Sequence, residues 1–310
     1  MNIMKENINF LYCFDTNYNL QAFTSMISLL DCSTKKINIY VIHNENNFEL
    51  KVPNKILNHK NLILFESYQF DDYEHEFPNI KNVHISVATY FRLFIENYLP
   101  KKAKFFIFLD PDVICIKDPI NEIENTIEKL KNTTFTIAAK TEHNMGVKNI
   151  NVSDKYFNAG VMLIDYEKWQ FNNFQSKLIK KLKDLKNKIV QWDQDVLNSM
   201  LDGEYLELKE ILNFKAATKT HKTFKSEVLM VHYMGSHKPW LTSGIFQKDS
   251  NYYHSNYRKV GHNSFHIEHK WRVRSAIDFF FALITFRVFR INRPFIFIYE
   301  FIVSILKNKN

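Results

Sequence analysis

Residues 105–113 read Phe105-Phe-Ile-Phe-Leu-Asp-Pro-Asp-Val113. Five consecutive apolar residues predict a strand that is buried on both faces of a sheet. Two carboxylates, Asp110 and Asp112, follow where that strand ends. Both can reach one hard cation such as Mn²⁺ or Mg²⁺, which in turn can bind phosphate oxygens. The alternative is a solvated Asp-Pro turn. Since Asp193-Gln194-Asp195 repeats the same spacing, the pattern alone does not decide between the two.

Other short apolar runs lie on either side of this strand and alternate with amphipathic helical patterns. This alternation is typical of an α/β domain with a mostly parallel sheet, in which ligands bind at the carboxyl ends of the strands. The strands expected are Ile8–Phe14, Ile37–Ile42, Leu62–Phe65, Phe105–Leu109 and Phe135–Ala139. The helices expected are Tyr18–Leu30, Ser86–Leu99 and one marked by Phe174, Leu178, Leu182, Leu185 and Ile189.

The glycine content restricts how such a fold can bind a nucleotide. The chain has six glycines, and they form neither a G-x-G-x-x-G nor a G-x-x-x-x-G-K pattern. A glycine-rich loop that cradles phosphates is therefore excluded. If the domain binds a nucleotide diphosphate, a metal ion and cationic side chains must balance the negative charge.

A histidine in the segment 228–240 could complete a metal site. His232 ends the apolar run Val228-Leu-Met-Val231, and Lys238 follows six residues later. A neutral imidazole is a suitable third ligand for Mn²⁺, and the lysine could meet a diphosphate. The alternative is a structural histidine at the end of a strand.

Two polar corners offer further candidates. Asn158-Ala159-Gly160 precedes an apolar run, where Asn158 offers a donor and an acceptor and Gly160 lets a ligand approach the backbone; a tight turn before a core strand is the alternative. At residues 192–198, Gln194 and a neighbouring carboxylate could face a sugar. Asp193 could equally cap the helix that follows.

Taken together and in this order, these segments resemble the bacterial members of glycosyltransferase family 8, the group of lipooligosaccharide galactosyltransferases and lipopolysaccharide core glucosyl- and galactosyltransferases. The resemblance covers roughly residues 8–242. Its six ordered blocks are Phe14–Tyr18, His84–Leu93, Leu109–Val113, Tyr156–Trp169, Asp193–Asn198 and His232–Trp240.

The resemblance implies a Rossmann-like GT-A fold, a UDP-galactose or UDP-glucose donor, Mn²⁺ or Mg²⁺ as the cofactor, and retention of the anomeric configuration. By position, the implied metal ligands are Asp110, Asp112 and His232, and the implied nucleotide contacts are Asp15, Asn17 and Tyr18. Arg92, Asn158, Ala159 and Gly160 would line the donor sugar, and Gly235 and Lys238 would meet the diphosphate. Gln194 would face the sugar as a catalytic residue, with Asp193 beside it at the sugar hydroxyls.

One departure concerns the donor. After Phe135–Ala139, the galactosyltransferases of this family typically carry an acidic residue near the donor-sugar hydroxyls. Here the chain continues Lys140-Thr141-Glu142. The resemblance therefore leaves galactose and glucose open.

The carboxyl-terminal region differs in character from the rest of the chain. Residues 265–310 carry a balance of +5 out of the net charge of +8, and they mix arginines with aromatic residues. No stretch reaches the roughly 20 apolar residues of a membrane-spanning helix. Such a segment can lie in the interface of an anionic leaflet, which would hold the protein at the cytoplasmic face of the inner membrane beside a lipid-linked oligosaccharide acceptor. Packing on the catalytic body, or against a second copy, is the alternative.

The sequence therefore predicts a GT-A catalytic domain over residues 1–250 and a helical membrane-associating region over 251–310. No signal peptide is apparent, so no export is expected. Three cysteines without metal-ligand spacing favour free thiols in a reducing compartment. A metal-dependent UDP-sugar hydrolase and a non-catalytic sugar-binding protein are the competing functions. A nucleic-acid partner is excluded, because the first 264 residues carry only +3 of the charge.

Overall fold

A seven-stranded sheet forms the centre of the computed structural model, which describes residues 7–46, 50–71, 77, 86–142, 155–216 and 227–307. The strand order is β3-β2-β1-β4-β7-β6-β8. Strand β7 runs antiparallel to both of its neighbours, and the other neighbouring pairs are parallel. The strands are β1 (Ile8–Phe14), β2 (Ile37–His43), β3 (Leu62–Gln69), β4 (Phe105–Leu109), β6 (Ile137–Thr141), β7 (Phe157–Asp165) and β8 (Leu206–Glu207). The expected α/β fold with a mostly parallel sheet is confirmed.

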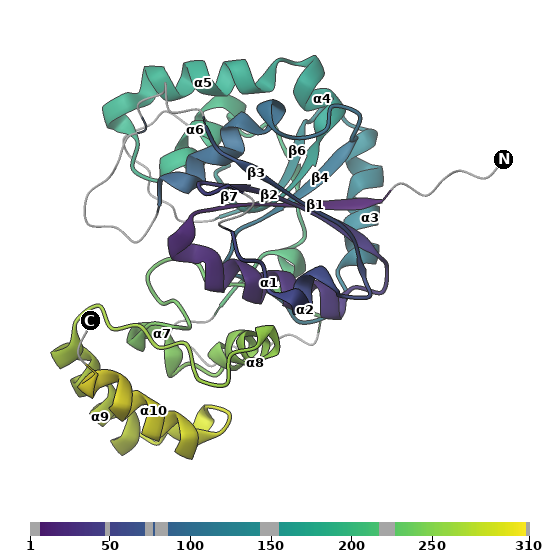
Figure 1. Ribbon diagram of the computed structural model, residues 1–310. Coiled ribbons are helices and arrows are strands. Elements are labelled where there is room, and N and C mark those ends of the chain that lie inside the picture. Colours follow the sequence, from purple (N-terminus) through teal and green to yellow (C-terminus); the bar gives the residue numbers. More distant parts are fainter. Residues whose placement is uncertain are drawn as a thin grey trace.

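Helices cover both faces of this sheet (Figure 1). Each face has its own apolar cluster, because strands buried on both faces present side chains to both layers. One layer holds the 3₁₀ helix η2 (Val87–Asn97), α4 (Tyr166–Phe171), α5 (Phe174–Leu185) and α6 (Trp192–Leu201). The other layer holds α1 (Asn19–Cys32), α2 (Asn54–Leu57) and α3 (Ile120–Lys131).

Several boundaries differ from the sequence expectation. Strand β3 continues to Gln69, beyond the expected Phe65, and helix α5 ends at Leu185, before Ile189. The strand expected at Phe135–Ala139 begins two residues later, at Ile137. The helix expected at Ser86–Leu99 has 3₁₀ geometry, and Phe94 leaves the helical region with φ −114° and ψ 21°. The Arg92 Nε–H donates to the Thr89 carbonyl at 3.1 Å, so a side chain competes for a carbonyl that an α-helix would use. The apolar pattern is compatible with both geometries, so it could not separate them. His84 and Ile85 of the same block lie outside the described residues.

A second, three-stranded sheet brings distant parts of the chain together. Its order is β5-β10-β9, with β5 (Val113–Cys115) antiparallel to β10 (Met230–His232) and β9 (Phe214–Lys215) parallel to β10. Strand β5 begins directly after Asp112. Since His232 pairs with Val113 in the register, the imidazole and the Asp110–Asp112 segment are brought to the same place.

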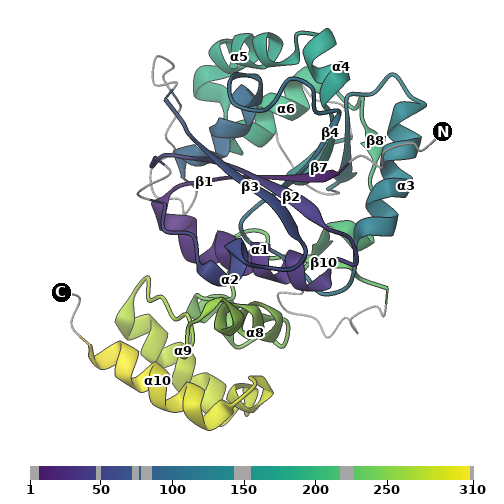
Figure 2. The same cartoon turned by 45° about the vertical axis from the view of Figure 1, so that its right-hand side comes forward.

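The carboxyl-terminal helices form a layer at the end of the molecule opposite α4, α5 and α6 (Figures 1 and 2). Helix α8 (Ser250–Val260) lies against α1, with α7 (Thr242–Ile245) nearby. Beyond it, α9 (Arg272–Ile284), the 3₁₀ helix η5 (Arg287–Arg290) and α10 (Pro294–Leu306) pack on one another. Their shared core contains Phe246, Phe279 and Phe301, and the rings of the last two stack at 4.3 Å. The remaining short 3₁₀ helices are η1 (Thr16–Tyr18), η3 (Lys186–Lys188) and η4 (Glu210–Leu212).

Buried His254 makes the stability of the α8 layer dependent on pH. The side chain is 1% exposed, and its Nε2 lies 3.0 Å from the Pro239 carbonyl. Burial lowers the pKa of His254 from 6.5 to about 3. Below about pH 6.5 the unfolded chain takes up this proton and the folded protein does not. The free energy of unfolding therefore falls by about 1.4 kcal/mol per pH unit on acidification.

We expect the wild type to lose about 2 kcal/mol more than His254→Gln when urea unfolding is compared at about pH 7.5 and about pH 5. Glutamine keeps a donor that can reach the Pro239 carbonyl, but it does not titrate. Equal losses in the two proteins would show that His254 does not carry this dependence.

Candidate active site

Three side chains that are far apart in the sequence meet where β4 and β10 end and β5 begins. Asp110 follows β4, Asp112 precedes β5, and His232 is the last residue of β10. One ligand atom from each lies within 4.8 Å of the other two. The His232 Nε2 is 3.2 Å from Asp112 Oδ1 and 3.8 Å from Asp110 Oδ2. The structure thus brings together all three side chains that the sequence analysis picked as metal ligands.

Gly160 is the residue that lets these groups approach one another. Its carbonyl accepts the Asp110 backbone N–H at 2.8 Å, so β7 runs directly alongside the carboxylates. A Cβ atom at this position would overlap His232 Cε1 and lie 2.7 Å from Asp110 Oδ2. Any side chain here would displace at least one of the three groups, so the position requires glycine.

Lys238 balances the charge of Asp112. Its ammonium forms an ion pair with Asp112 Oδ2 and also donates to the Tyr233 carbonyl at 2.8 Å. Burial opposes ionisation of Asp112. The Lys238 ammonium and the neighbouring His232 outweigh burial and hold the pKa of this carboxyl well below its usual value. Asp112 is therefore an ionised, buried acceptor, as a ligand for a hard cation must be.

Arg92 connects Asp110 to Asp193 beneath the site. The guanidinium is 4% exposed, and it donates to Asp110 Oδ1 at 2.8 Å and to the Ala159 carbonyl at 2.7 Å. Its Nε lies 2.9 Å from Asp193 Oδ2, which makes an ion pair. Burial raises the pKa of Asp193 to about 6, although Arg92 acts in the opposite direction. The alternative that Asp193 caps α6 is wrong, because Gln191 occupies the cap and Asp193 faces Arg92 instead.

Gln194 and Asn158 are held at the site by hydrogen bonds. The Gln194 Oε1 accepts from the Ala159 N–H at 3.0 Å and from Asn158 Nδ2 at 3.3 Å. Its Nε2 donates to the Tyr156 hydroxyl at 3.2 Å. The Tyr156 hydroxyl in turn donates a hydrogen bond to Asp195 Oδ1, at 2.7 Å. Both ends of the Gln194 amide are therefore fixed in position.

These groups open into a cavity of about 380 Å³. The residues predicted from sequence that line it are Tyr18, Arg92, Asp110, Asp112, Asn158, Gln194, His232, Gly235 and Lys238. Those that lie nearby without lining it are Asp15, Asn17, Ala159, Gly160 and Asp193. Asp15 accepts the Asn17 backbone N–H at 3.0 Å and the Ser86 hydroxyl, so its carboxylate stabilises η1 and links it to η2.

The cavity also contains residues that the sequence analysis did not select. Glu142 lines it, with its carboxylate 3.2 Å from the Lys215 ammonium and 3.4 Å from Asn158 Nδ2. The Lys140 ammonium instead forms an ion pair with Glu207 Oε1, at 2.7 Å. Asn213, which is 2% exposed, does not line the cavity but contacts His232. Neither Asn213 nor Lys215 belongs to a recognisable motif, so only their place in the small sheet reveals them.

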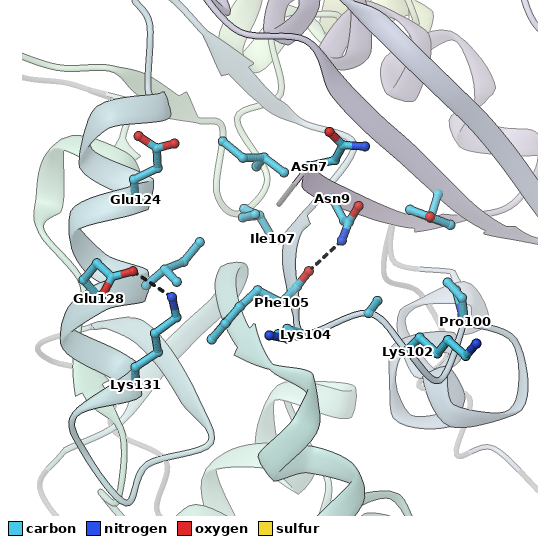
Figure 3. A pocket seen from close by; sticks show the side chains of 14 residues that line it. Asn7, Asn9, Pro100, Lys102, Lys104, Phe105, Ile107, Glu124, Glu128 and Lys131 are labelled. Carbon is cyan, nitrogen blue, oxygen red and sulfur yellow. Dashed lines mark hydrogen bonds and ion pairs between the residues drawn. The ribbon is translucent and has the colours of Figure 1, made fainter. Parts of the chain in front are cut away.

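A larger cavity of about 760 Å³ lies at the amino ends of β1 and β4, beside α3 (Figure 3). Its carboxylates are paired with lysines: Glu124 with Lys35 at 2.6 Å, and Glu128 with Lys131 at 2.7 Å. None of the residues predicted for catalysis or binding lines it. Among the described residues, the Asp110, Asp112 and His232 group is the one set of side chains that could hold a metal ion. The side chains that could bind a metal ion therefore favour the smaller cavity as the active site.

Comparison with known proteins gives a family match over the part of the chain that contains the candidate site. The family model described as glycosyl transferase family 8 matches residues 9–244. General stress protein A of Bacillus subtilis is 26% identical over 278 residues, which cover 80% of this chain and 93% of that protein. Lipopolysaccharide 1,3-galactosyltransferase of Salmonella typhimurium is 30% identical over 183 residues, 54% of this chain and 53% of the relative.

Among solved structures, the galactosyltransferase LgtC in complex with donor and acceptor sugar analogues superposes with a TM-score of 0.67. The alignment covers 82% of this chain and 97% of that one, at 20% identity. At this identity the likeness concerns the fold, which is the GT-A arrangement expected from the sequence.

Proposed function

Because the chain belongs to glycosyl transferase family 8, we propose that it transfers galactose or glucose from a UDP-sugar to a lipooligosaccharide or lipopolysaccharide core acceptor, with retention of configuration and with Mn²⁺ as its cofactor. The observation that carries this proposal is the meeting of Asp110, Asp112 and His232 at the wall of a cavity that also holds Lys238 and Gln194. Two relatives, a lipopolysaccharide 1,3-galactosyltransferase and a lipopolysaccharide glucosyltransferase, support the choice of donor and acceptor. The chain spans about half the length of each.

The residues at the proposed metal site fit the ion. Two carboxylates and one imidazole form a donor set suited to Mn²⁺, with Mg²⁺ as the alternative. The three ligands can lie this close together because glycine at position 160 has no side chain to separate them. This closeness supports a site in which one small ion is bound by all three. When bound, the ion would act as a Lewis acid and offset charge on the diphosphate.

We propose that the other predicted residues bind different parts of the donor. We place the diphosphate at Gly235 and Lys238, since the lysine ammonium reaches the cavity and no atom lies within 4 Å of a Cβ at Gly235. Tyr18 lines the cavity and could stack on uracil, with Asp15 and Asn17 beside it. The donor sugar would lie against Arg92, Asn158, Ala159, Gly160 and Asp193.

The proposed chemistry assigns a non-covalent role to Gln194. The acceptor hydroxyl would attack from the face that the diphosphate leaves, and the leaving oxygen would accept its proton. Lys238 would neutralise charge that develops on the leaving group. Since the Gln194 Oε1 already accepts two hydrogen bonds, it is a poor nucleophile, and its dipole would steady positive charge on the sugar.

The activity can be tested with purified protein, Mn²⁺ and four donors: UDP-galactose, UDP-glucose and their N-acetyl forms. We expect UDP release from one of the hexose donors that rises when truncated lipooligosaccharide is added and stops when Mn²⁺ is chelated. Release that is equally fast without acceptor would favour the hydrolase instead. No turnover of any donor would favour a sugar-binding protein.

The carboxyl-terminal layer is proposed to rest on the cytoplasmic face of the inner membrane. Helix α8 of this layer lies against α1, so the alternative of packing against the body holds for that face, and α9 and α10 pack in turn on Ile245 and Phe246. The outer face leaves large apolar side chains exposed beside arginines. The exposed set is Trp271, Val273, Ile277, Phe280, Phe281, Ile284, Phe286, Phe289, Phe295, Ile296, Tyr299, Ile302 and Leu306. This number of exposed apolar side chains in a basic segment fits an anionic leaflet. The boundary near residue 250 stays a prediction.

No helix in the described part of the chain has the length and apolarity needed to cross a bilayer. Helix α10 has 13 residues and is about 20 Å long, whereas the hydrocarbon core is about 30 Å thick. The proposal is therefore association with the surface and not insertion across it.

We expect the triple substitution Trp271→Ser, Phe286→Ser and Phe295→Ser to weaken binding to anionic lipid vesicles on the order of 100-fold or more. These side chains are 73%, 72% and 77% exposed, so the fold should not depend on them. Vesicle sedimentation measures the effect. Turnover of a water-soluble acceptor should be unchanged. Unaltered sedimentation would exclude this face as the membrane contact.

A further inference from the structure

A chain of hydrogen bonds runs from the backbone of β7 to the imidazole of His232. The Gly160 N–H donates to Asn158 Oδ1 at 3.0 Å. Asn213 Nδ2 lies 3.1 Å from the same oxygen, and Asn213 Oδ1 lies 2.9 Å from His232 Nδ1. Asn213 and His232 are 2% and 3% exposed, so water does not compete for these bonds.

The direction of each bond in this chain follows from the first one. A backbone N–H can only donate, so the Asn158 atom that faces Gly160 must be its oxygen. The Asn213 atom that shares this oxygen must then be its nitrogen, which turns the Asn213 oxygen toward His232. An amide oxygen can only accept, so His232 Nδ1 carries a hydrogen. The other ring nitrogen, Nε2, faces Asp110 and Asp112.

We propose that Asn213 is a positioning residue for the metal site, which fixes both the ring orientation and the tautomer of His232 so that Nε2 gives its lone pair to the ion. The inference rests on the proposed function, since it requires Asp110, Asp112 and His232 to bind a cation. A partner on the second ring nitrogen typically holds a metal-binding histidine in place, and its loss costs about 10- to 100-fold in metal affinity.

The fold explains why the amide comes from residue 213. Asn213 lies between η4 and β9, and β9 pairs in parallel with β10, with Phe214 opposite Val231 and Lys215 opposite His232. The small sheet therefore brings the residue just before β9 next to the histidine that ends β10. Through Asn158, which also contacts Gln194 at 3.3 Å, the same bonds connect the proposed metal site to the proposed catalytic amide.

Binding of Mn²⁺ to the full chain without donor tests this role, with the electron paramagnetic resonance signal of free Mn²⁺ as the readout. Asn213→Leu removes the acceptor at similar volume, and we expect about 10- to 100-fold weaker binding. Asn213→Asp keeps an oxygen facing His232 Nδ1, and we expect binding within about threefold of the wild type. Asn38→Leu is the matched control, because Asn38 is also buried and hydrogen-bonded, to Asn9 at 2.9 Å, far from the site.

A double-mutant cycle separates positioning from a general loss of structure. In a His232→Ala background, Asn213→Leu should have no further effect on Mn²⁺ binding, since no ring is left to orient. Equal losses with and without His232, or wild-type affinity in Asn213→Leu, would overturn the positioning role while leaving the metal site intact. Absence of Mn²⁺ binding by the wild-type chain would overturn the metal site itself, and with it the role of Asn213.

Discussion

Replacing Asp110 with asparagine is expected to lower the rate of sugar transfer about 1000-fold, even with excess Mn²⁺. The substitution keeps the size of the side chain but removes a charge from the proposed ligand set. It also leaves the buried Arg92 guanidinium, now 2.8 Å from Asp110 Oδ1, facing a neutral amide. Both changes raise the cost of holding a cation next to a diphosphate. Steady-state UDP release at increasing Mn²⁺ concentration measures the loss.

The matched control for this substitution is Asp31→Asn. Asp31 is also ion-paired, with Lys259 at 2.7 Å, and lies 3.2 Å from His59 Nε2, but it is at the end of α1 and does not line the cavity. We expect its turnover to equal that of the wild type. A nearly normal rate for Asp110→Asn would remove Asp110 from the metal site.

Gly160→Ala is expected to weaken Mn²⁺ binding and to lower turnover about 100-fold or more, although it adds a single methyl group. The new Cβ would overlap His232 Cε1 and press on Asp110 Oδ2. The backbone cannot retreat easily, because the Gly160 carbonyl is bonded to the Asp110 N–H within the sheet. The imidazole must therefore leave the position that it shares with the carboxylates. Mn²⁺ binding and UDP release are measured together.

Gly261→Ala is the control for a glycine substitution that does not touch the site. Gly261 has a φ of +129° and open space around its Cβ position, so alanine there strains the backbone after α8 without a steric overlap. We expect it to cost about 1 kcal/mol of stability and to leave Mn²⁺ binding unchanged. If Gly160→Ala bound Mn²⁺ as tightly as Gly261→Ala does, the close packing of His232 against β7 would not matter for the site.

Much of the fold could be predicted from the sequence because its strands are continuous apolar runs. Ile8–Phe14 and Phe105–Leu109 are found as expected, since strands buried on both faces need no polar alternation. For the Val87–Asn97 segment, the apolar pattern predicts a helix but not its type. One apolar face satisfies an α-helix and a 3₁₀ helix alike, and the choice between them depends on side-chain bonds such as that of Arg92, which the pattern does not contain.

The site was predictable only in so far as its residues belong to motifs. Asp110 and Asp112 were visible as two carboxylates at the end of a strand and His232 as a histidine that ends another, and the resemblance favoured the metal site over the structural alternatives. The small sheet that joins them consists of strands of two or three residues, too short to leave a periodic signal. Asn213 and Lys215 were therefore missed, because their place next to the histidine follows from the pairing of β9 with β10.

The most direct test of the central claim is the anomalous scattering of manganese in crystals grown with Mn²⁺ and a UDP-sugar. We expect one strong peak between Asp110, Asp112 and His232, in contact with the diphosphate of a donor that lies in the cavity of about 380 Å³. A donor ordered in that cavity with no manganese among these three side chains would contradict that claim.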